Sequence, residues 1–206
     1  MLHLKRQDFD DLDHLHRINL INSCSGFKSA NLIGTKSNDG IPNVAIFSSV
    51  THFGSNPPLL GIIFRPVSDV PRNTYENIKE TGQFTINHIH RDIIEQAHHT
   101  SAKYDKRISE FDVTELEEEY KNNWHAPFVK GAPVQIALTY CEEYKIKANN
   151  TIQLIAEIKD LYVKDELVEK DGFINLSKGN VMTINGLDGY ALPSLKQRID
   201  YQRPIK

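Results

Sequence analysis

Two long segments near the C-terminal end restrict the fold of this chain more than any other feature. Residues 134–146 and 151–163 alternate apolar with polar side chains over most of their length, and this alternation is the period of a β-strand. The pair Asn149-Asn150 between them is typical of a tight turn. Long strands joined by a short turn predict an antiparallel β-barrel and argue against a doubly wound α/β sheet.

Shorter predicted elements fill the segment 31–87. The dipeptide Asp39-Gly40 supplies the positive φ of a tight hairpin turn, and Pro42 places the following strand at a sheet edge or at its own first residue. The predicted strands are 30–35, 44–47, 59–64 and 83–88. A helix is expected to begin at a cap provided by Asn73 or Thr74 and to end at Thr81-Gly82.

The remaining segments predict short helices rather than further sheets. Residues 91–98 are expected to be helical, and residues 116–121 are expected to form an acidic helix after a Thr114 cap. Residues 10–22 are either a short helix or a lid-like arm. The 206 residues fit one domain, 1–206, with residues 1–27 as an N-terminal arm.

Charge and composition exclude several classes of function. The net charge is −3 and the sequence contains no basic block, so we expect no nucleic-acid partner. The charged N-terminus lacks an apolar leader, which predicts a cytoplasmic protein. Residues 41–64 lack charged side chains, but their prolines, asparagines and glycines indicate strands and turns rather than a membrane span. Cys24 and Cys141 are isolated and far apart in the sequence, so we expect a pair of buried or idle thiols.

Hydroxyl and guanidinium groups follow several predicted strand ends. Ser48 and Ser49 come directly after one strand, Arg65 comes after the next, and Arg72 and Thr74 lie at the start of the predicted helix. If strands 44–47 and 59–64 are neighbours, these groups converge and provide the donors that a phosphate needs. The alternative is that the serines only stabilise turns and the arginines only pair with surface acids. The residues alone leave both interpretations open.

Other chemical motifs are weak or absent. The glycines match neither a GxGxxG turn nor a phosphate-binding P-loop. The histidines, among them His88 and His90, lack metal-ligand spacing, so no metal site is predicted. The aromatic loop 124–128 is expected either to pack or to cover a ring system.

The order of several motifs resembles the flavin reductase-like family of FMN-binding split barrels. The matching segments cover roughly residues 28–204 and comprise Asn43–Ser49, Asn56–Leu59, Arg72–Ile78, Phe84–Asn87, Ser101–Tyr104, Ser109–Phe111, Ala132–Val134 and Tyr201–Pro204. Two departures stand out. Many relatives have Ala-Pro-Phe-Ser where this chain has Ala45-Ile46-Phe47-Ser48. Many also have Lys-Asp-Thr where this chain has Arg72-Asn73-Thr74, so this chain keeps the positive charge but lacks the acid.

The resemblance implies a mainly β fold with inserted helices, a six-stranded antiparallel split barrel, and a homodimer with FMN near the subunit interface. It implies that FMN-contacting residues include Asn43, Ala45, Phe47, Ser48, Ser49, Arg65, Arg72, Thr74, Ser101, Ala102 and Lys103. In this family the chemistry belongs to the flavin, so no catalytic side chain is named.

The resemblance leads to three functional hypotheses. The first is an FMN-dependent NAD(P)H:flavin oxidoreductase, with hydride passing through flavin N5 and a downstream electron acceptor as a further partner. The second is an FMN-binding electron carrier that lacks a nicotinamide step of its own. The third is a barrel that binds another phosphate-bearing ligand, such as pyridoxal phosphate.

Overall fold

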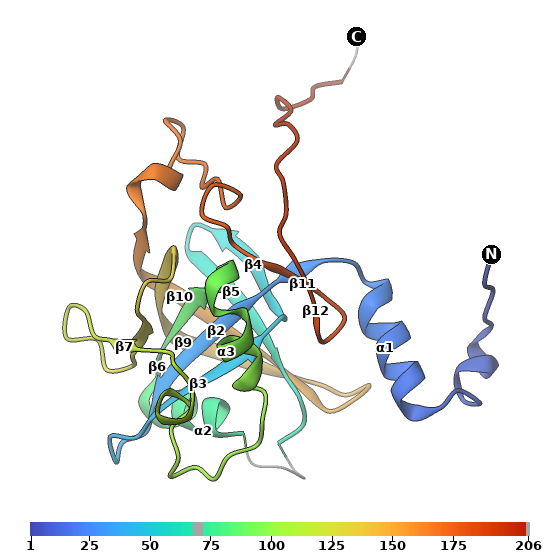
Figure 1. Cartoon of the computed structure of the whole chain (residues 1–206), viewed down its shortest axis with the longest axis horizontal. Helices are drawn as coiled ribbons and strands as arrows, with labels where there is room; N and C mark the ends of the chain where they lie inside the picture. The colour runs from blue at the N-terminus through green and yellow to red at the C-terminus, as the bar shows by residue number, and fades with distance from the viewer. Residues whose placement is uncertain (68–71, 205–206) are drawn as a thin grey trace.

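A computed structural model describes residues 1–67 and 72–204, and most of these residues surround one curled antiparallel sheet (Figure 1). In this part of the chain, seven strands form the sheet in the order β3-β2-β6-β9-β10-β5-β4. They are β2 (Asn31–Lys36), β3 (Pro42–Phe47), β4 (Val50–Ser55), β5 (Pro58–Phe64), β6 (Gln83–His88), β9 (Val134–Ile146) and β10 (Thr151–Val163).

Smaller elements lie around this sheet. A three-stranded sheet contains β1 (Lys28–Ser29), β11 (Thr183–Asn185) and β12 (Gly189–Ala191), and a two-stranded one contains β7 (Glu118–Glu119) and β8 (Phe128–Val129). The helices are η1 (Arg6–Phe9), α1 (His14–Cys24), α2 (Asn73–Thr81), η2 (Arg91–Ile93), α3 (Ile94–His99), α4 (Glu110–Val113) and η3 (Asp165–Leu167).

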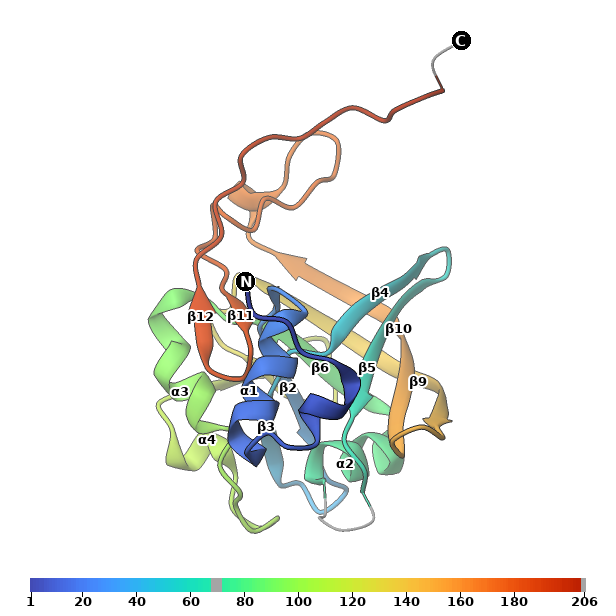
Figure 2. The same ribbon diagram turned by 90° about the vertical axis from the view of Figure 1, so that its right-hand side faces the viewer.

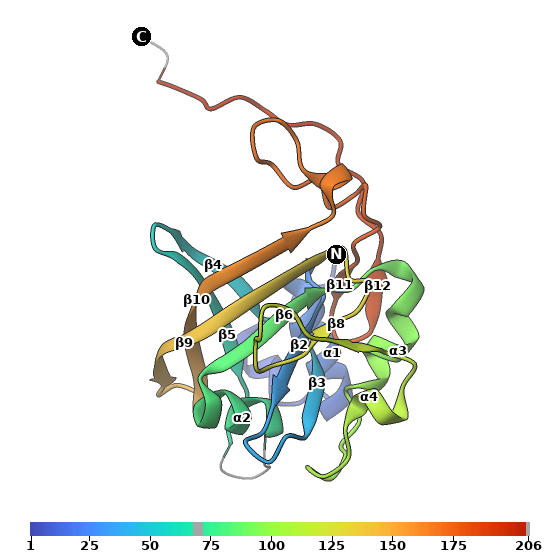
Figure 3. The same ribbon diagram turned by 90° about the vertical axis from the view of Figure 1, so that its left-hand side faces the viewer.

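The sheet curls into a barrel because its two edge strands are joined by a very short link. Only Ser48 and Ser49 connect β3 to β4, although these strands lie at opposite ends of the strand order. The two edges do not pair as a ladder. Instead the Phe47 ring on β3 packs against the Phe64 ring on β5 across the gap, with the centroids 5.2 Å apart. The Ser49 hydroxyl donates to the carbonyl of Ile63, 2.9 Å away, one position beyond the β4–β5 ladder. We call this gap, bounded by β3 and by β5 with β4, the seam; Figures 2 and 3 show the barrel from two sides.

Two apolar clusters stabilise the fold, one on each face of β2. The barrel interior contains buried residues from five strands and from α2, including Ile33, Ile62, Ile78, Phe84, Ile86, Leu138 and Leu154. The second cluster lies outside the barrel beneath α3 and α4 and includes Leu32, Val44, Ile89, Ala97 and Phe111. Neighbouring residues of β2 face opposite clusters, as expected for a strand buried on both sides.

The predicted split barrel is confirmed, but the predicted six strands are one too few for the main sheet. The additional strand is β4, whose side chains are mostly exposed, Phe53 included, so it lacks the apolar alternation that marks a half-buried strand. The condition considered for strands 44–47 and 59–64, that they are neighbours in the sheet, is not met. They lie at separate positions in the strand order, and their Phe47 and Phe64 rings meet across the seam.

Local predictions were mostly confirmed. The hairpin at residues 149–150 forms between β9 and β10, and Pro42 is the first residue of an edge strand. The predicted acidic helix at 116–121 is wrong, because Glu118 and Glu119 pair with β8 instead. The cap of α2 is Arg72 rather than Asn73 or Thr74, and the left-handed Gly82, with φ 71°, ends the helix as predicted.

Both ends of the chain project from the barrel (Figure 1). The N-terminal arm contains η1 and α1, and the Asp13 carboxylate caps α1 by accepting from the amides of Leu15 and His16. No residue of η1 or α1 is buried. The C-terminal tail, residues 192–204, has no regular secondary structure. Among the described residues, no helix combines the length and the apolar character needed to cross a membrane.

Candidate functional site

The ends of β3 and β5 and the start of α2 meet at the seam. The Phe47 and Phe64 rings pack edge to face with their centroids 5.2 Å apart, and the Tyr75 ring follows Phe64 at 5.5 Å. Tyr75 donates to Glu143 at 2.9 Å, and burial together with this carboxylate raises the pKa of Tyr75 to about 12. These three segments therefore approach one another across the barrel and not along the sheet. The convergence of the serine and arginine side chains on one ligand stays a prediction.

A buried hydrogen-bond network fixes α2 to the edge of the sheet. The Asn43 side-chain amide donates to the hydroxyls of Thr35 (3.3 Å) and Thr74 (3.1 Å). Asn77 donates to the same Thr35 hydroxyl at 3.1 Å. All four side chains are buried. Both Asn43 amide protons are thus used within the protein, so its role is to hold Thr74 rather than to donate to a ligand.

The start of α2 has the features of an anion site. Arg72 is the N-cap residue, and no side chain caps the helix, so the first amides of α2 lack a side-chain partner among the described residues. The Arg72 Nε atom is buried and has no hydrogen-bond partner in the same set of residues. A helix start without a side-chain cap and a buried, unpartnered Arg72 Nε, both among the described residues, together fit a phosphate.

The free edge of β3 faces the segment 94–113. The Val44 amide donates to the buried Glu110 carboxylate, 3.1 Å away. Burial raises the pKa of Glu110, whereas the amides of Glu110 and Val44 act in the opposite direction. Since alternate amides of an edge strand point the same way, Ile46 also directs its amide outward. Glu110 was not predicted as a site residue, because a single glutamate in a short acidic stretch looks like a solvated surface residue.

The remaining predicted contacts are distributed around this region. Ala45 lies on β3, and Ser48 is half-buried in the link that spans the seam. Arg65 is exposed directly after β5. Ser101, Ala102 and Lys103 are exposed in the loop after α3, and no hydrogen bond connects their described side chains with the seam. Their contact with a flavin stays a prediction.

The histidines offer no competing metal centre. Burial lowers the pKa of His88 to about 4, and its Nδ1 atom has no partner among the described residues, so this imidazole is neutral at physiological pH. His98 Nδ1 lies 3.0 Å from the Tyr190 hydroxyl. In the part of the chain that the structure describes, no group of three or more potential ligands could hold a metal ion.

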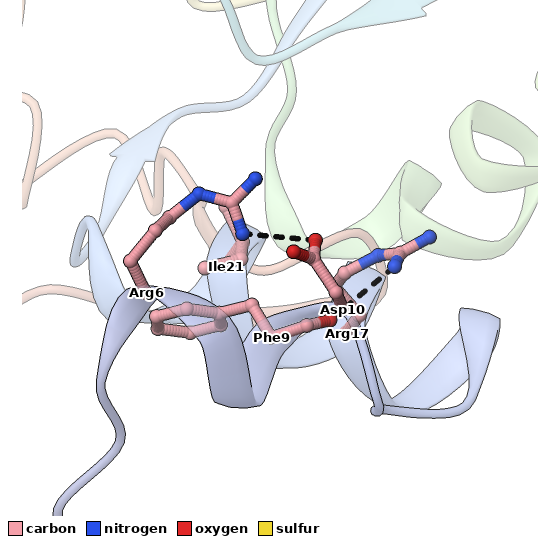
Figure 4. Close-up of a pocket in the computed structure, with 5 residues that line it drawn as sticks. All are labelled: Arg6, Phe9, Asp10, Arg17 and Ile21. Carbon is pink, nitrogen blue, oxygen red and sulfur yellow. Dashed lines mark hydrogen bonds and ion pairs between the residues drawn. The ribbon is translucent and has the colours of Figure 1, made fainter.

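A surface hollow of about 590 Å³ lies in the N-terminal arm (Figure 4). Its lining comprises Arg6, Phe9, Asp10, Arg17 and Ile21. The Arg6 guanidinium pairs with Asp10 at 2.8 Å, and Arg17 donates to the Phe9 carbonyl at 3.3 Å. These charged groups satisfy one another within the arm, so the hollow does not share the unsatisfied donors of the seam.

Comparison with known families agrees with this geometry. Residues 25–182 match the model of the flavin reductase like domain. The chain belongs to the flavin reductase-like family. The matched region begins just before β1 and ends just before β11, so the family match includes the whole seam but not most of the N-terminal arm or the tail.

Solved structures resemble this flavin reductase-like chain over nearly its full length. A candidate flavin reductase with a split barrel domain from Shewanella frigidimarina NCIMB 400 is 45% identical, with a TM-score of 0.94, and the match covers 98% of this chain and 100% of that one.

Two more distant structures share the fold. Nitrilotriacetate monooxygenase component B from Bacillus cereus is 18% identical with a TM-score of 0.83, and the match covers 97% of this chain and 98% of that one. An FMN-binding protein from Thermus thermophilus is 12% identical with a TM-score of 0.71, and the match covers 86% of this chain and 93% of that one.

Proposed function

We propose that this chain is an FMN-binding oxidoreductase of the NAD(P)H-dependent flavin reductase type. The observation that carries the proposal is the unsatisfied anion site at the start of α2, where Arg72 Nε is buried without a partner among the described residues. The family match and the FMN-binding structural neighbour support the phosphate of a flavin as the anion that binds there. The seam provides the aromatic and hydroxyl groups beside that site.

We propose that different residues of the chain hold different parts of the cofactor. Arg72 and the first amides of α2 are proposed to bind the phosphate, with Arg65 adding positive charge. The Thr74 oxygen already accepts from Asn43, so its hydroxyl proton is available to donate. Ser48 and the outward edge of β3 are proposed to contact the polar parts of the flavin.

FMN, when bound, supplies the chemistry by accepting a hydride from a nicotinamide and passing electrons to an acceptor. The protein positions the cofactor and excludes water from it. The packed rings of Phe47, Phe64 and Tyr75 make the seam rigid and apolar behind the proposed site. The Glu110 carboxylate fixes the neighbouring edge of β3 through the Val44 amide.

Spectroscopy tests this proposal directly. Purified protein is expected to be yellow, or to bind added FMN in a fluorescence titration, and then to oxidise NADH or NADPH. FMN binding without oxidation of either nicotinamide would favour the electron-carrier hypothesis. A protein that does not bind FMN, but binds pyridoxal phosphate, would contradict a flavin function and support a different phosphate-bearing ligand.

We also propose that the protein is a homodimer. The short helix α1 has no buried residue, and Leu15 and Ile21 on it are 67% and 48% exposed. Helices of this length are marginal without packing. In the tail, Ile199 and Tyr201 are 72% and 91% exposed. A second copy would cover these apolar side chains.

Light scattering is expected to give twice the chain mass of 23.5 kDa. Replacing both Leu15 and Ile21 with glutamate should shift the protein toward monomer, because it places charge on a face that the partner covers. His16→Glu, an exposed position on the other side of the same helix, is the control and should leave the mass unchanged. A wild-type mass of one chain at micromolar concentration would contradict the dimer.

A further inference from the structure

The buried network beneath α2 has one residue at its centre. Thr35 lies on β2 opposite Asn43, its register partner on β3. Its side-chain oxygen accepts from Asn43 at 3.3 Å and from Asn77 at 3.1 Å. A hydroxyl oxygen has two lone pairs, so these two bonds saturate it. Thr35 is completely buried, with 0% exposure, and therefore cannot itself contact a ligand.

The network assigns a direction to each hydrogen bond. An amide nitrogen only donates, so Thr35 and Thr74 both accept from the Asn43 amide. The Thr74 proton is thereby directed away from Asn43. Thr74 is 6% exposed and lies in the first turn of α2, two residues after Arg72. The hydroxyl is thus held as a hydrogen-bond donor at the end of α2 that carries Arg72, whose buried Nε has no partner among the described residues.

The same network also sets the position of the helix itself. Asn77 lies one turn after Asn73, and its bond to Thr35 ties α2 to β2. The bond between Asn43 and Thr74 ties α2 to β3. Both bonds depend on acceptor oxygens at fixed places. Buried polar groups that are fully paired hold one arrangement, whereas unpaired ones destabilise it.

We propose that Thr35 is a positioning residue for phosphate selectivity. It acts through Asn43, which keeps Thr74 in the donor role, and through Asn77, which keeps the start of α2 against the sheet edge. This inference rests on the proposed FMN function and adds to it a residue that determines how strongly the protein prefers FMN to riboflavin. Riboflavin carries the same ring system and ribityl chain but no phosphate.

The test is a pair of fluorescence titrations, with FMN and with riboflavin, on wild-type protein and two Thr35 variants. Thr35→Val has a similar shape and lacks the hydroxyl, so Asn43 and Asn77 each lose an acceptor. We expect FMN affinity to fall about five- to tenfold, the effect of about one hydrogen bond. Riboflavin affinity should change less than about twofold. Thr35→Ser retains the hydroxyl and should keep the wild-type ratio of the two affinities.

Asn43→Asp provides a second approach, which remains informative if Thr35→Val does not fold. The variant has nearly the same size, but its carboxylate accepts hydrogen bonds and would capture the Thr74 proton. The ratio of FMN affinity to riboflavin affinity in Asn43→Asp should fall at least as far as in Thr35→Val. Melting temperatures of the ligand-free variants establish that each is folded, and loss of stability alone would lower both affinities together.

The outcomes separate this inference from the proposed function. A wild-type protein that binds neither flavin, or binds both with equal affinity, would overturn the phosphate site and the role of Thr35 together. A wild-type protein that prefers FMN, with an unchanged preference in Thr35→Val or Asn43→Asp, would overturn only the role of Thr35. A reduced preference in both variants, with Thr35→Ser like wild type, supports it.

Discussion

Arg72→Glu is expected to weaken FMN binding by about 10- to 150-fold, which corresponds to the loss of one charge-assisted hydrogen bond of roughly 1.5–3 kcal/mol. The reason is electrostatic: the variant places a carboxylate where we propose a phosphate, at a helix start with no side-chain cap. Like charges repel strongly where water is largely excluded. A fluorescence titration with FMN measures the change.

A charge-matched control separates this local effect from the change in net charge. Lys170→Glu alters the charge by the same amount in an exposed turn that precedes Gly172, and it should leave FMN affinity within about twofold. The affinity for riboflavin should also change little in Arg72→Glu. If Arg72→Glu binds FMN as tightly as wild type does, Arg72 does not belong to the phosphate site.

Gly34→Ala is expected to lower the free energy of unfolding by about 2–3 kcal/mol, near the top of the range for an overpacked core. A Cβ atom at this position would overlap the carbonyl oxygen of Pro127 and lie 2.6 Å from the Thr85 hydroxyl. That hydroxyl donates to the same carbonyl at 2.6 Å, so both atoms are fixed. For a chain of this length the melting temperature should fall by about 5–10 °C, as measured by calorimetry or circular dichroism.

The matched control for this stability prediction is Gly54→Ala. Gly54 lies on the edge strand β4, and its Cβ would meet only the carbonyl of Pro57 at 3.3 Å. A shift of a few tenths of an ångström relieves that contact, so the loss should be well below 1 kcal/mol. Equal melting temperatures for Gly34→Ala and wild type would show that the loop at Ala126 and Pro127 can move away from β2 without loss of stability.

The elements that the sequence predicted correctly are those whose local pattern agrees with their final environment. The strands β9 and β10 alternate because one face lies in the barrel interior, and Gly82 ends α2 because a left-handed residue is easiest for glycine. The strand β4 and the pairing of Glu118 and Glu119 escaped prediction. Their exposed polar side chains carry no period, and only partner strands determine their conformation.

The candidate site shows the same division. The sequence could mark Arg72, Ser48 and Ser49 as candidate phosphate donors, because these residue types supply the donors that a phosphate needs; their contact with a phosphate stays a prediction. Thr35 and Glu110 were missed. A threonine inside an apolar strand looks like an ordinary β-former, and a glutamate among acids looks solvated, so neither carries a local signal of its buried partners.

The sequence by itself determined the type of fold and which segment carries candidate anion-binding groups, since both depend on local period, turn residues and residue chemistry. Only the tertiary structure decided which groups meet. The two-residue link at Ser48 and Ser49 forces the edge strands together across the seam, and the Thr35 oxygen gathers side chains from positions 8 and 42 residues away. Contacts at such separations depend on the curvature of the whole sheet, which no local pattern in the chain specifies.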